Sequence, residues 1–170
     1  MDEHRMGELN RLTQIVIERL PRLALYARQW LDAASADDVV QEALVKLLMQ
    51  PAPPDDPIAW MCRAVRNAAI NSARSSSRRR RREQSAAESR REWFEARPES
   101  LIDAQLAEQT LRNLPDRQRE IVVLRIWNGL GFAQIGQIVG LSTTTVHDQY
   151  AAALEHMRRA LENPCRNKTD

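Results

Sequence analysis

The amino-acid sequence predicts an all-α protein of two small helical domains joined by a basic linker. Its 170 residues suffice for one ordinary domain or two small ones. Only 5 residues are Gly and 5% are aromatic, while Ala, Leu, Arg, Glu and Gln, all good helix formers, are abundant. Apolar residues recur at helical spacing in two blocks, and a stretch rich in Ser, Arg and Glu separates them.

The first block begins with residues 9–31, which we expect to form one helix or two because Pro21 breaks or restarts the apolar pattern. The next helix follows Ser35, a favourable N-cap, and carries Asp37 and Asp38 in its first turn. Its expected inward stripe consists of Val39, Val40, Ala43, Leu44, Leu47 and Leu48.

A proline-rich loop is expected next, because four prolines in the nine residues 49–57 exclude a helix. Asp56 is then the expected cap of a helix that has Pro57 at its first position and runs from Ile58 to about Arg74. Residues 75–100 lack a strong helical periodicity, and we interpret them as a linker that is extended or partly helical.

The second block predicts four helices. They are residues 101–114, a helix opened by Pro115 and Asp116, the short segment "FAQIGQIV", and a helix from Thr143 to about Leu161. The expected apolar stripe of the last helix consists of Val146, Tyr150, Leu154, Met157 and Leu161.

Positive charge is concentrated in one segment, although the net charge is only +2. Residues 1–62 hold 6 basic and 10 acidic side chains, and residues 92–170 hold 9 basic and 11 acidic ones. Residues 63–91 hold 10 Arg against 2 Glu. A polyanion should therefore bind first to this middle segment.

The two cysteines, Cys62 and Cys165, fit no metal-ligand spacing. Cys62 lies within a helical pattern, so we expect it to be buried rather than reactive; Cys165 is given no role. The sequence shows neither an apolar stretch resembling a signal peptide nor a membrane-length segment. We therefore expect a cytoplasmic protein without membrane insertion.

The stretch "IGQIVGLSTTTVHDQY" has the sequence pattern of a helix-turn-helix, in which Gly140 ends one helix and Ser142 caps the next. The residues expected to seal the inside of the corner are Ile135, Ile138, Val139, Leu141 and Val146. The second helix would then present Thr143, Thr144, Thr145, His147 and Asp148 to a major groove. The alternative is an ordinary helical bundle with a serine cap.

Three motifs in order resemble the extracytoplasmic-function sigma factors of bacterial RNA polymerase. They are "DDVVQEALVKLL", "PIAWMCRAVRNAAINSARSSSRRRRR" and "LPDRQREIVVLRIWNGLGFAQIGQIVGLSTTTV". The resemblance implies sigma region 2 at residues 9–84, a linker at 85–100, region 4 at 101–163 and a tail at 164–170. The first domain would bind the polymerase clamp and the minus-ten element, and the second would bind the minus-thirty-five element and the flap.

The resemblance also assigns roles to residues. The resemblance assigns core-polymerase binding to Asp37, Asp38, Gln41 and Glu42. The alternative role of this acidic face is a favourable interaction with the helix dipole at the N-terminus of a solvated helix, and both roles can hold at once. Minus-ten contact falls on the loop residues Gln50, Pro51, Pro53, Pro54 and Asp55, and on Arg63, Arg66, Asn67, Asn71 and Arg74. Linker contact with nucleic acid falls on Arg78, Arg79, Arg80, Arg81 and Arg82. Minus-thirty-five contact falls on Ser142, Thr143, Thr144, Thr145, His147 and Asp148.

One residue of the first domain keeps two interpretations. Trp60 matches a tryptophan of the family, and it is expected in the core more than as a stacking platform for a base.

The recognition helix departs from the family pattern. Where the family often has basic residues, this chain has His147, Asp148 and Gln149. Asp148 can accept a hydrogen bond from cytosine, but it also repels a nearby phosphate. Most of the attraction to DNA is therefore expected from the first domain and the linker.

The expected partners are core RNA polymerase through its clamp and flap, promoter DNA, and a separate anti-sigma factor. We expect no enzymatic activity, small-molecule substrate, cofactor or metal, because the sequence has no catalytic triad order, no phosphate-binding glycine loop and no clustered ligands. The competing hypothesis is a free-standing helix-turn-helix regulator that acts without polymerase. It leaves the acidic-Gln helix and the proline loop unexplained.

Overall fold

The computed structural model describes residues 7, 13–83 and 108–162, with side chains given up to residue 77 and from residue 108. All regular secondary structure in this described part is helical, which confirms the predicted all-α class. The chain divides into two compact units, residues 1–92 and 93–170. No described helix combines the length and the apolar character that a membrane crossing requires.

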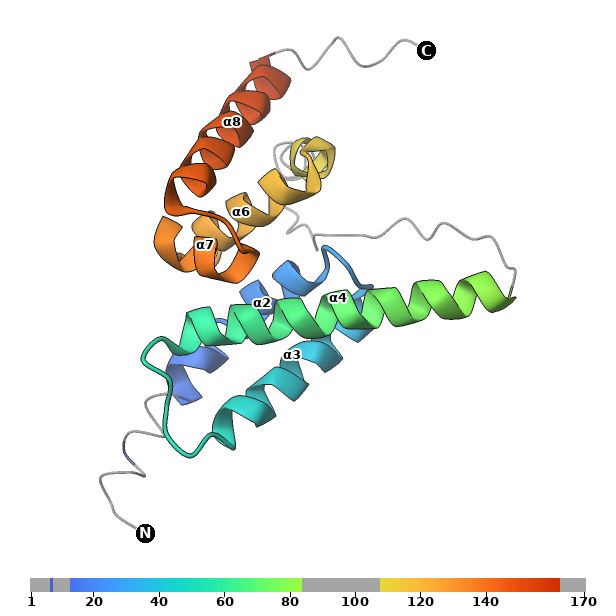
Figure 1. The fold of residues 1–170 in the computed structure, drawn as a ribbon, viewed down its shortest axis with the longest axis vertical. Helices are drawn as coiled ribbons and strands as arrows, with labels where there is room; N and C mark the ends of the chain where they lie inside the picture. Colours follow the sequence, from blue (N-terminus) through green and yellow to red (C-terminus); the bar gives the residue numbers. More distant parts are fainter. Residues whose placement is uncertain (1–6, 8–12, 84–107, 163–170) are drawn as a thin grey trace, which may run out of the picture. The chain divides into compact units, whose positions relative to one another are not determined.

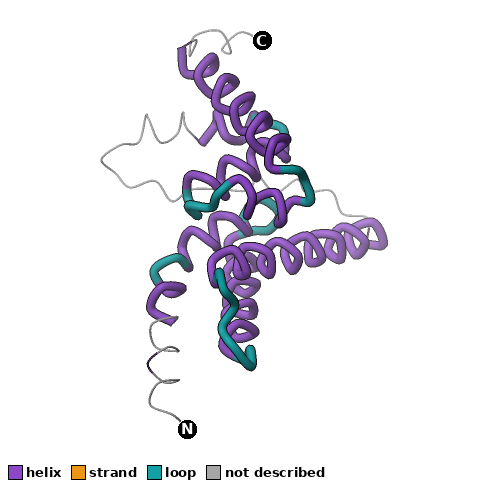
Figure 2. Tube along the Cα trace, turned by 60° about the vertical axis from the view of Figure 1, so that its left-hand side comes forward, coloured by secondary structure: helices purple, strands orange, loops and turns teal. Residues whose placement is uncertain are grey.

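The first unit contains α2 (Leu20–Ala27), α3 (Ala33–Leu48) and α4 (Pro57–Glu83), preceded by a helical stretch at residues 13–17. Each of the three named helices packs against the other two (Figures 1 and 2). The largest fully buried side chains of this core are Val16, Leu23, Tyr26, Leu47, Met61 and Val65. Pro21 lies in the first turn of α2, where its missing N–H removes no helical hydrogen bond, so it restarts the helix.

Helix α3 begins earlier than the sequence predicted. Its N-cap is Asp32, whose side chain accepts a hydrogen bond from the Ser35 backbone N–H at 2.9 Å. The prediction that Ser35 is the cap is therefore wrong, and Asp37 and Asp38 lie in the second turn rather than the first. An aspartate cap is as effective as a serine cap, and the earlier start places Ala36 in the core.

Helix α4 begins where the sequence predicted and ends nine residues later than predicted. Pro57 is its first residue, and the Asp56 side chain accepts from the Ala59 N–H at 2.9 Å. The helix then continues past Arg74 to Glu83, a length of 27 residues or about 40 Å. No Gly or Pro interrupts it, and Arg is a good helix former. The lost periodicity after Arg74 coincides with the exposure of Ser75, Ser76 and Ser77, while the helix itself continues.

The second unit contains a helical stretch at residues 108–113, then α6 (Asp116–Ile126), α7 (Phe132–Val139) and α8 (Thr143–Glu162). One core cluster combines Leu111, Leu114, Val122 and Ala153, with Trp127, Tyr150 and Met157 packed against it. The predicted stripe of α8 is wrong at two positions, because Leu154 and Leu161 are 40% and 45% exposed and Ala153 is buried in their place.

The turn between α7 and α8 is tight. Gly140 ends α7 with φ of 75°, a left-handed conformation that favours glycine. A Cβ at Gly136 would lie 2.6 Å from the Leu141 carbonyl oxygen, so only glycine lets the turn pack this closely. Arg117 donates from Nη1 to the Val139 carbonyl at 3.1 Å and so ties the end of α7 to α6.

Candidate nucleic-acid and protein interfaces

Helix α3 presents one continuous exposed stripe on the side away from the core. It consists of Asp38, Gln41, Glu42, Val45 and Met49, which we call the α3 stripe. Spacings of three and four residues keep these side chains within an arc of about 100°. Asp37 is also exposed and lies about 40° outside this arc. Glu42 is paired with Lys46 at 2.7 Å in a solvent-exposed contact.

The apolar part of the α3 stripe was missed by the sequence analysis. Val45 is 54% exposed and Met49 is 77% exposed, and both follow the acidic residues along the same face. Leu48, predicted to face inward, is 38% exposed at the margin of the stripe. The sequence did contain a sign of this exposed apolar surface. Leu47, Leu48 and Met49 are three consecutive apolar residues at the end of α3, and only Leu47 is buried in the core. The face therefore combines negative charge with apolar surface, a combination suited to a protein partner.

The loop between α3 and α4 is an exposed rim. Gln50, Pro51, Pro53 and Asp55 are exposed and Pro54 is half-buried. Gln50 donates from Nε2 to the Lys46 carbonyl at 3.1 Å, so its side chain turns back onto the end of α3.

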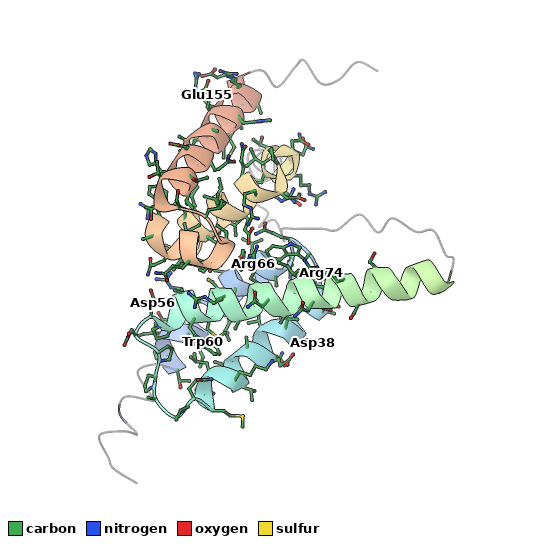
Figure 3. All side chains as sticks on the ribbon, in the orientation of Figure 1. Asp38, Asp56, Trp60, Arg66, Arg74 and Glu155 are labelled. Atoms are coloured by element: carbon green, nitrogen blue, oxygen red, sulfur yellow. The ribbon has the colours of Figure 1, made fainter. Side chains whose placement is uncertain are left out.

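Helix α4 presents a second stripe of different chemistry. Arg63, Asn67, Asn71 and Arg74 are exposed and share one face, which we call the α4 stripe. Their spacings of four, four and three residues hold them within an arc of about 80°. Trp60 lies near the start of α4 (Figure 3) and is half-buried. Helical spacing places it in line with this stripe, and a half-buried position is compatible with both of its interpretations. Arg66 is half-buried and lies to one side of the stripe.

The five arginines 78–82 belong to α4 rather than to a separate linker. Their side chains lie outside the described part of the structure, and so does the segment 85–100 that was predicted as the linker.

The first turns of α8 expose the residues predicted to read DNA. Ser142, Thr143, Thr144, Thr145, His147 and Asp148 are all exposed, while Ile135, Ile138, Val139 and Val146 are buried at the corner. The predicted corner residue Leu141 is only half-buried.

Two of the six polar residues have a structural task. Ser142 Oγ accepts the Thr145 N–H at 3.1 Å and lies 2.8 Å from the Thr145 hydroxyl, so this pair closes the helix N-terminus. Thr143, Thr144, His147 and Asp148 are the exposed polar groups that remain for a base edge or a phosphate. The backbone N–H groups of this first turn also favour an anion.

A side-chain contact that the sequence analysis did not anticipate reaches His147. The Phe132 ring packs edge-on against the His147 ring, with centroids 5.4 Å apart and an interplanar angle of 89°. The Arg125 guanidinium carbon lies 4.7 Å from the centroid of the same Phe132 ring. No short motif signals this arrangement, because the three residues come from three helices.

Cys62 is buried, as predicted. Burial, together with the nearby Asp56 carboxylate, raises the pKa of its thiol from 9.0 to about 12 against the opposing effect of Arg19. A thiol held neutral in this way is neither a nucleophile nor a metal ligand at physiological pH.

Comparison with protein families gives two matches in chain order. Residues 15–79 match Sigma-70 region 2, and residues 104–157 match Sigma-70, region 4. The ECF RNA polymerase sigma factor ShbA of Streptomyces griseus subsp. griseus is 40% identical over 60 residues, which are 35% of this chain. The matched stretch spans only 31% of that relative.

Two solved structures share the fold. The sigma factor RpoE, solved with the anti-sigma factor NepR from Bartonella quintana, matches with a TM-score of 0.69 and 21% identity, over 88% of this chain and 96% of that one. CnrH, solved with the cytosolic domain of CnrY, matches with a TM-score of 0.59 and 23% identity, over 89% and 87% of the two chains. With both sigma regions matched in order and a relative of the same group, the chain belongs to the extracytoplasmic-function sigma factors of the sigma-70 family.

Proposed function

We propose that this sigma factor binds core RNA polymerase and directs it to promoters that carry specific minus-ten and minus-thirty-five elements. Residues 9–84 act as the polymerase-clamp and minus-ten domain, residues 85–100 as the tether, and residues 101–163 as the minus-thirty-five and flap domain. Sigma factors are not enzymes, and the chain contributes binding and selection while the polymerase performs the chemistry.

One observation carries this proposal. The first unit exposes two stripes of different chemistry on adjacent helices, the acidic and apolar α3 stripe and the basic and amide-bearing α4 stripe. The first suits a protein partner with basic and apolar groups, and the second suits a nucleic acid. A free-standing DNA-binding regulator needs only the second, so the pair favours a factor that bridges a protein machine and DNA.

The α4 stripe supports contact with the minus-ten element. Arg63 and Arg74 can bind phosphates, and Asn67 and Asn71 can bind base edges or sugars of an unpaired strand. The proline-rich loop is assigned to the capture of a flipped base. Extruding a base costs a few kcal/mol, and a loop stiffened by Pro51, Pro53 and Pro54 loses little entropy when it binds one.

The recognition helix is assigned to sequence selection rather than to attraction. No Lys or Arg lies between Thr143 and Glu155, so the helix supplies little counterion release. The basic segment 63–91 supplies that attraction, and tethering to polymerase raises the effective concentration of the helix at its site.

Run-off transcription with core polymerase on a library of genomic fragments tests the proposal directly. We expect this chain to produce discrete start sites preceded by two shared sequence elements. Start sites identical to those of polymerase without the chain would overturn the proposal. A footprint of the purified chain alone on duplex DNA at physiological salt, with no association with core polymerase, would support the free-standing regulator instead.

The α3 stripe can be tested with matched substitutions. Glu42→Gln and Val45→Ser change the charge and the apolar surface of the stripe, and Glu18→Gln changes an exposed carboxylate outside it. We expect the double variant to weaken the affinity for core polymerase by about tenfold or more, with Glu18→Gln close to wild type. Equal affinities of all variants would place polymerase docking on another surface.

Control is proposed to come from a separate anti-sigma factor that covers the polymerase-binding surface. Support comes from two solved structures of the same fold. The sigma factor RpoE was co-crystallised with the anti-sigma factor NepR, and CnrH was solved in complex with the cytosolic domain of CnrY. Transcription that stays constitutive in cells, whatever is encoded nearby, would count against this mode of control.

A further inference from the structure

Three side chains from three helices form a continuous contact series in the second unit, which we call the Phe132 bridge. Arg125 lies near the end of α6, Phe132 is the first residue of α7, and His147 lies in the second turn of α8. The Arg125 guanidinium stands 4.7 Å from the Phe132 centroid, and the His147 ring meets Phe132 edge-on at 5.4 Å. The bridge therefore joins both helices of the helix-turn-helix to the helix that precedes them.

The Phe132 ring is itself held in place. Arg125 donates from Nη1 to the Leu130 carbonyl at 2.9 Å, which fixes the guanidinium against the α6–α7 turn. Tyr150 packs on Phe132 at 5.4 Å with an interplanar angle of 56°. With a cation on the ring and a second aromatic side chain beside it, Phe132 is a rigid surface for a neighbouring imidazole.

His147 is the member of the bridge that faces solvent. Its side chain is 62% exposed, and an exposed side chain with this freedom ordinarily samples several rotamers. Here Phe132 lies against the ring, and Asp148 Oδ1 lies 3.6 Å from Nδ1. Because a carboxylate only accepts hydrogen bonds, its charge favours, within the neutral imidazole, the tautomer with the proton on Nδ1. Nε2 is then a hydrogen-bond acceptor.

We propose that Phe132 is a positioning residue that orients His147, and that His147 thereby selects a base bearing an exocyclic amino group in the minus-thirty-five element. An acceptor at Nε2 matches the amino groups that adenine and cytosine present in the major groove. The inference rests on the proposed DNA-reading role of α8. It goes further by assigning one base class to one side chain, and by assigning the orientation of that side chain to a residue outside the recognition helix.

The competing role for Phe132 is simple packing. Phe132 is half-buried and touches Tyr150, which packs on the core cluster of the second unit. A structural role predicts that loss of the ring weakens all minus-thirty-five contacts together. A positioning role predicts that loss of the ring changes the base preference only where His147 acts. Base preference measured position by position separates these two roles.

The experiment uses holoenzyme formed from core polymerase and the full chain, with run-off transcription on a promoter library randomised across the minus-thirty-five element. We expect wild type to prefer adenine or cytosine at one position by about fivefold, the discrimination of one good hydrogen bond. His147→Ala and Phe132→Leu should each reduce that preference to about twofold or less and leave the other positions unchanged. The double variant should lose no more than either single variant, because both remove the same contact.

Two control variants define the outcome. Phe132→Tyr keeps the ring and should keep the preference. Trp127→Phe perturbs packing on the core cluster without altering a residue of the bridge, and it should lower the melting temperature without changing any base preference. The inference is overturned if Phe132→Leu retains the preference that His147→Ala loses. It is also overturned if Phe132→Leu weakens every position equally, or if His147→Ala changes none. A wild-type holoenzyme with no minus-thirty-five preference at all would instead overturn the proposed function of α8.

Discussion

At the scale of single residues, the same residue type has different tasks according to its position on a helix. Leu47 completes the core of the first unit, whereas Val45 and Met49, on the opposite side of α3, are exposed beside Glu42. We propose that this apolar surface is part of the contact with a protein partner, because exposed apolar side chains beside charged ones suit such a contact. In that proposed contact, the acidic residues would supply charge complementarity and the exposed apolar residues would supply the burial that gives affinity.

Cys62 gives a prediction about reactivity. Its raised pKa reduces the thiolate fraction at pH 8 by about a thousandfold relative to an ordinary thiol. We expect Cys62 in the folded chain to resist iodoacetamide at pH 8 and to react readily in urea, as measured by mass spectrometry of its peptide. Labelling of the folded chain at the rate of free glutathione would contradict the burial.

The same thiol predicts a loss of stability at alkaline pH. The folded chain keeps the Cys62 proton to a pKa of about 12, and an unfolded chain loses it near 9.0. The unfolded state therefore binds fewer protons above pH 9, and the free energy of unfolding should fall as the pH rises toward 12. Urea midpoints at pH 8 and pH 10 should differ more for wild type than for Cys62→Ala, and an equal difference would contradict the assignment.

Asp148 predicts a separation of promoter choice from polymerase binding. Its carboxylate is exposed on the proposed DNA-reading face. A carboxylate there repels phosphates and can accept a hydrogen bond from the amino group of cytosine. We expect Asp148→Ala to change relative promoter activities by about fivefold or more and to leave the affinity for core polymerase unchanged. Glu42→Gln should give the reverse result, and equal losses in both assays for Asp148→Ala would contradict the prediction.

At the scale of elements, the helix-turn-helix depends on one glycine. A methyl group at position 136 would meet the Leu141 backbone oxygen at 2.6 Å, and a backbone atom in a tight turn cannot move aside easily. We expect Gly136→Ala to lower the free energy of unfolding by about 1–3 kcal/mol, despite the better helix propensity of alanine. Gln137→Ala, at an exposed position of the same helix, should stay within about 0.5 kcal/mol. Equal urea midpoints for the two variants would show that the turn can relax.

Helices α4 and α8 show that the helical periodicity of apolar residues reports burial of one face rather than the length of the helix. In α4, helical periodicity is clear while one face is buried, and it disappears after Arg74 although the helix continues to Glu83. In α8, the sequence placed Leu154 and Leu161 inward, yet Ala153 occupies the core and both leucines are about half exposed. Apolar spacing therefore locates helices well and their inner faces less well, because the neighbouring helix decides which small side chain fits.

At the scale of the whole molecule, the proposed function separates attraction to DNA from sequence selection. Basic residues are concentrated at 63–91, in the first unit, while the helix-turn-helix lies in the second unit with few cations at its reading end. Neither unit needs strong affinity of its own if both are held on one polymerase and one promoter, because the second contact is then intramolecular.

This arrangement predicts that the covalent tether is essential. A protease site inserted between residues 97 and 98, cleaved in assembled holoenzyme, should reduce minus-thirty-five-dependent transcription by about a hundredfold. The same site inserted after residue 167 serves as the control and should have no effect after cleavage. Full activity of the cleaved holoenzyme would mean that each unit is retained by its own contacts.

The sequence by itself determined the all-α class, the positions of most helices, the proline restart at Pro21, the Asp56 and Ser142 caps and the Gly140 stop. These features depend on interactions within about four residues, which a local sequence contains in full. The tertiary structure decided that Val45, Leu48 and Met49 of α3 are exposed. It also decided which small residue of α8 enters the core, and how Arg125, Phe132 and His147 meet. Those outcomes depend on contacts between segments that are distant in sequence, and the geometry of such contacts is set only when the helices pack together.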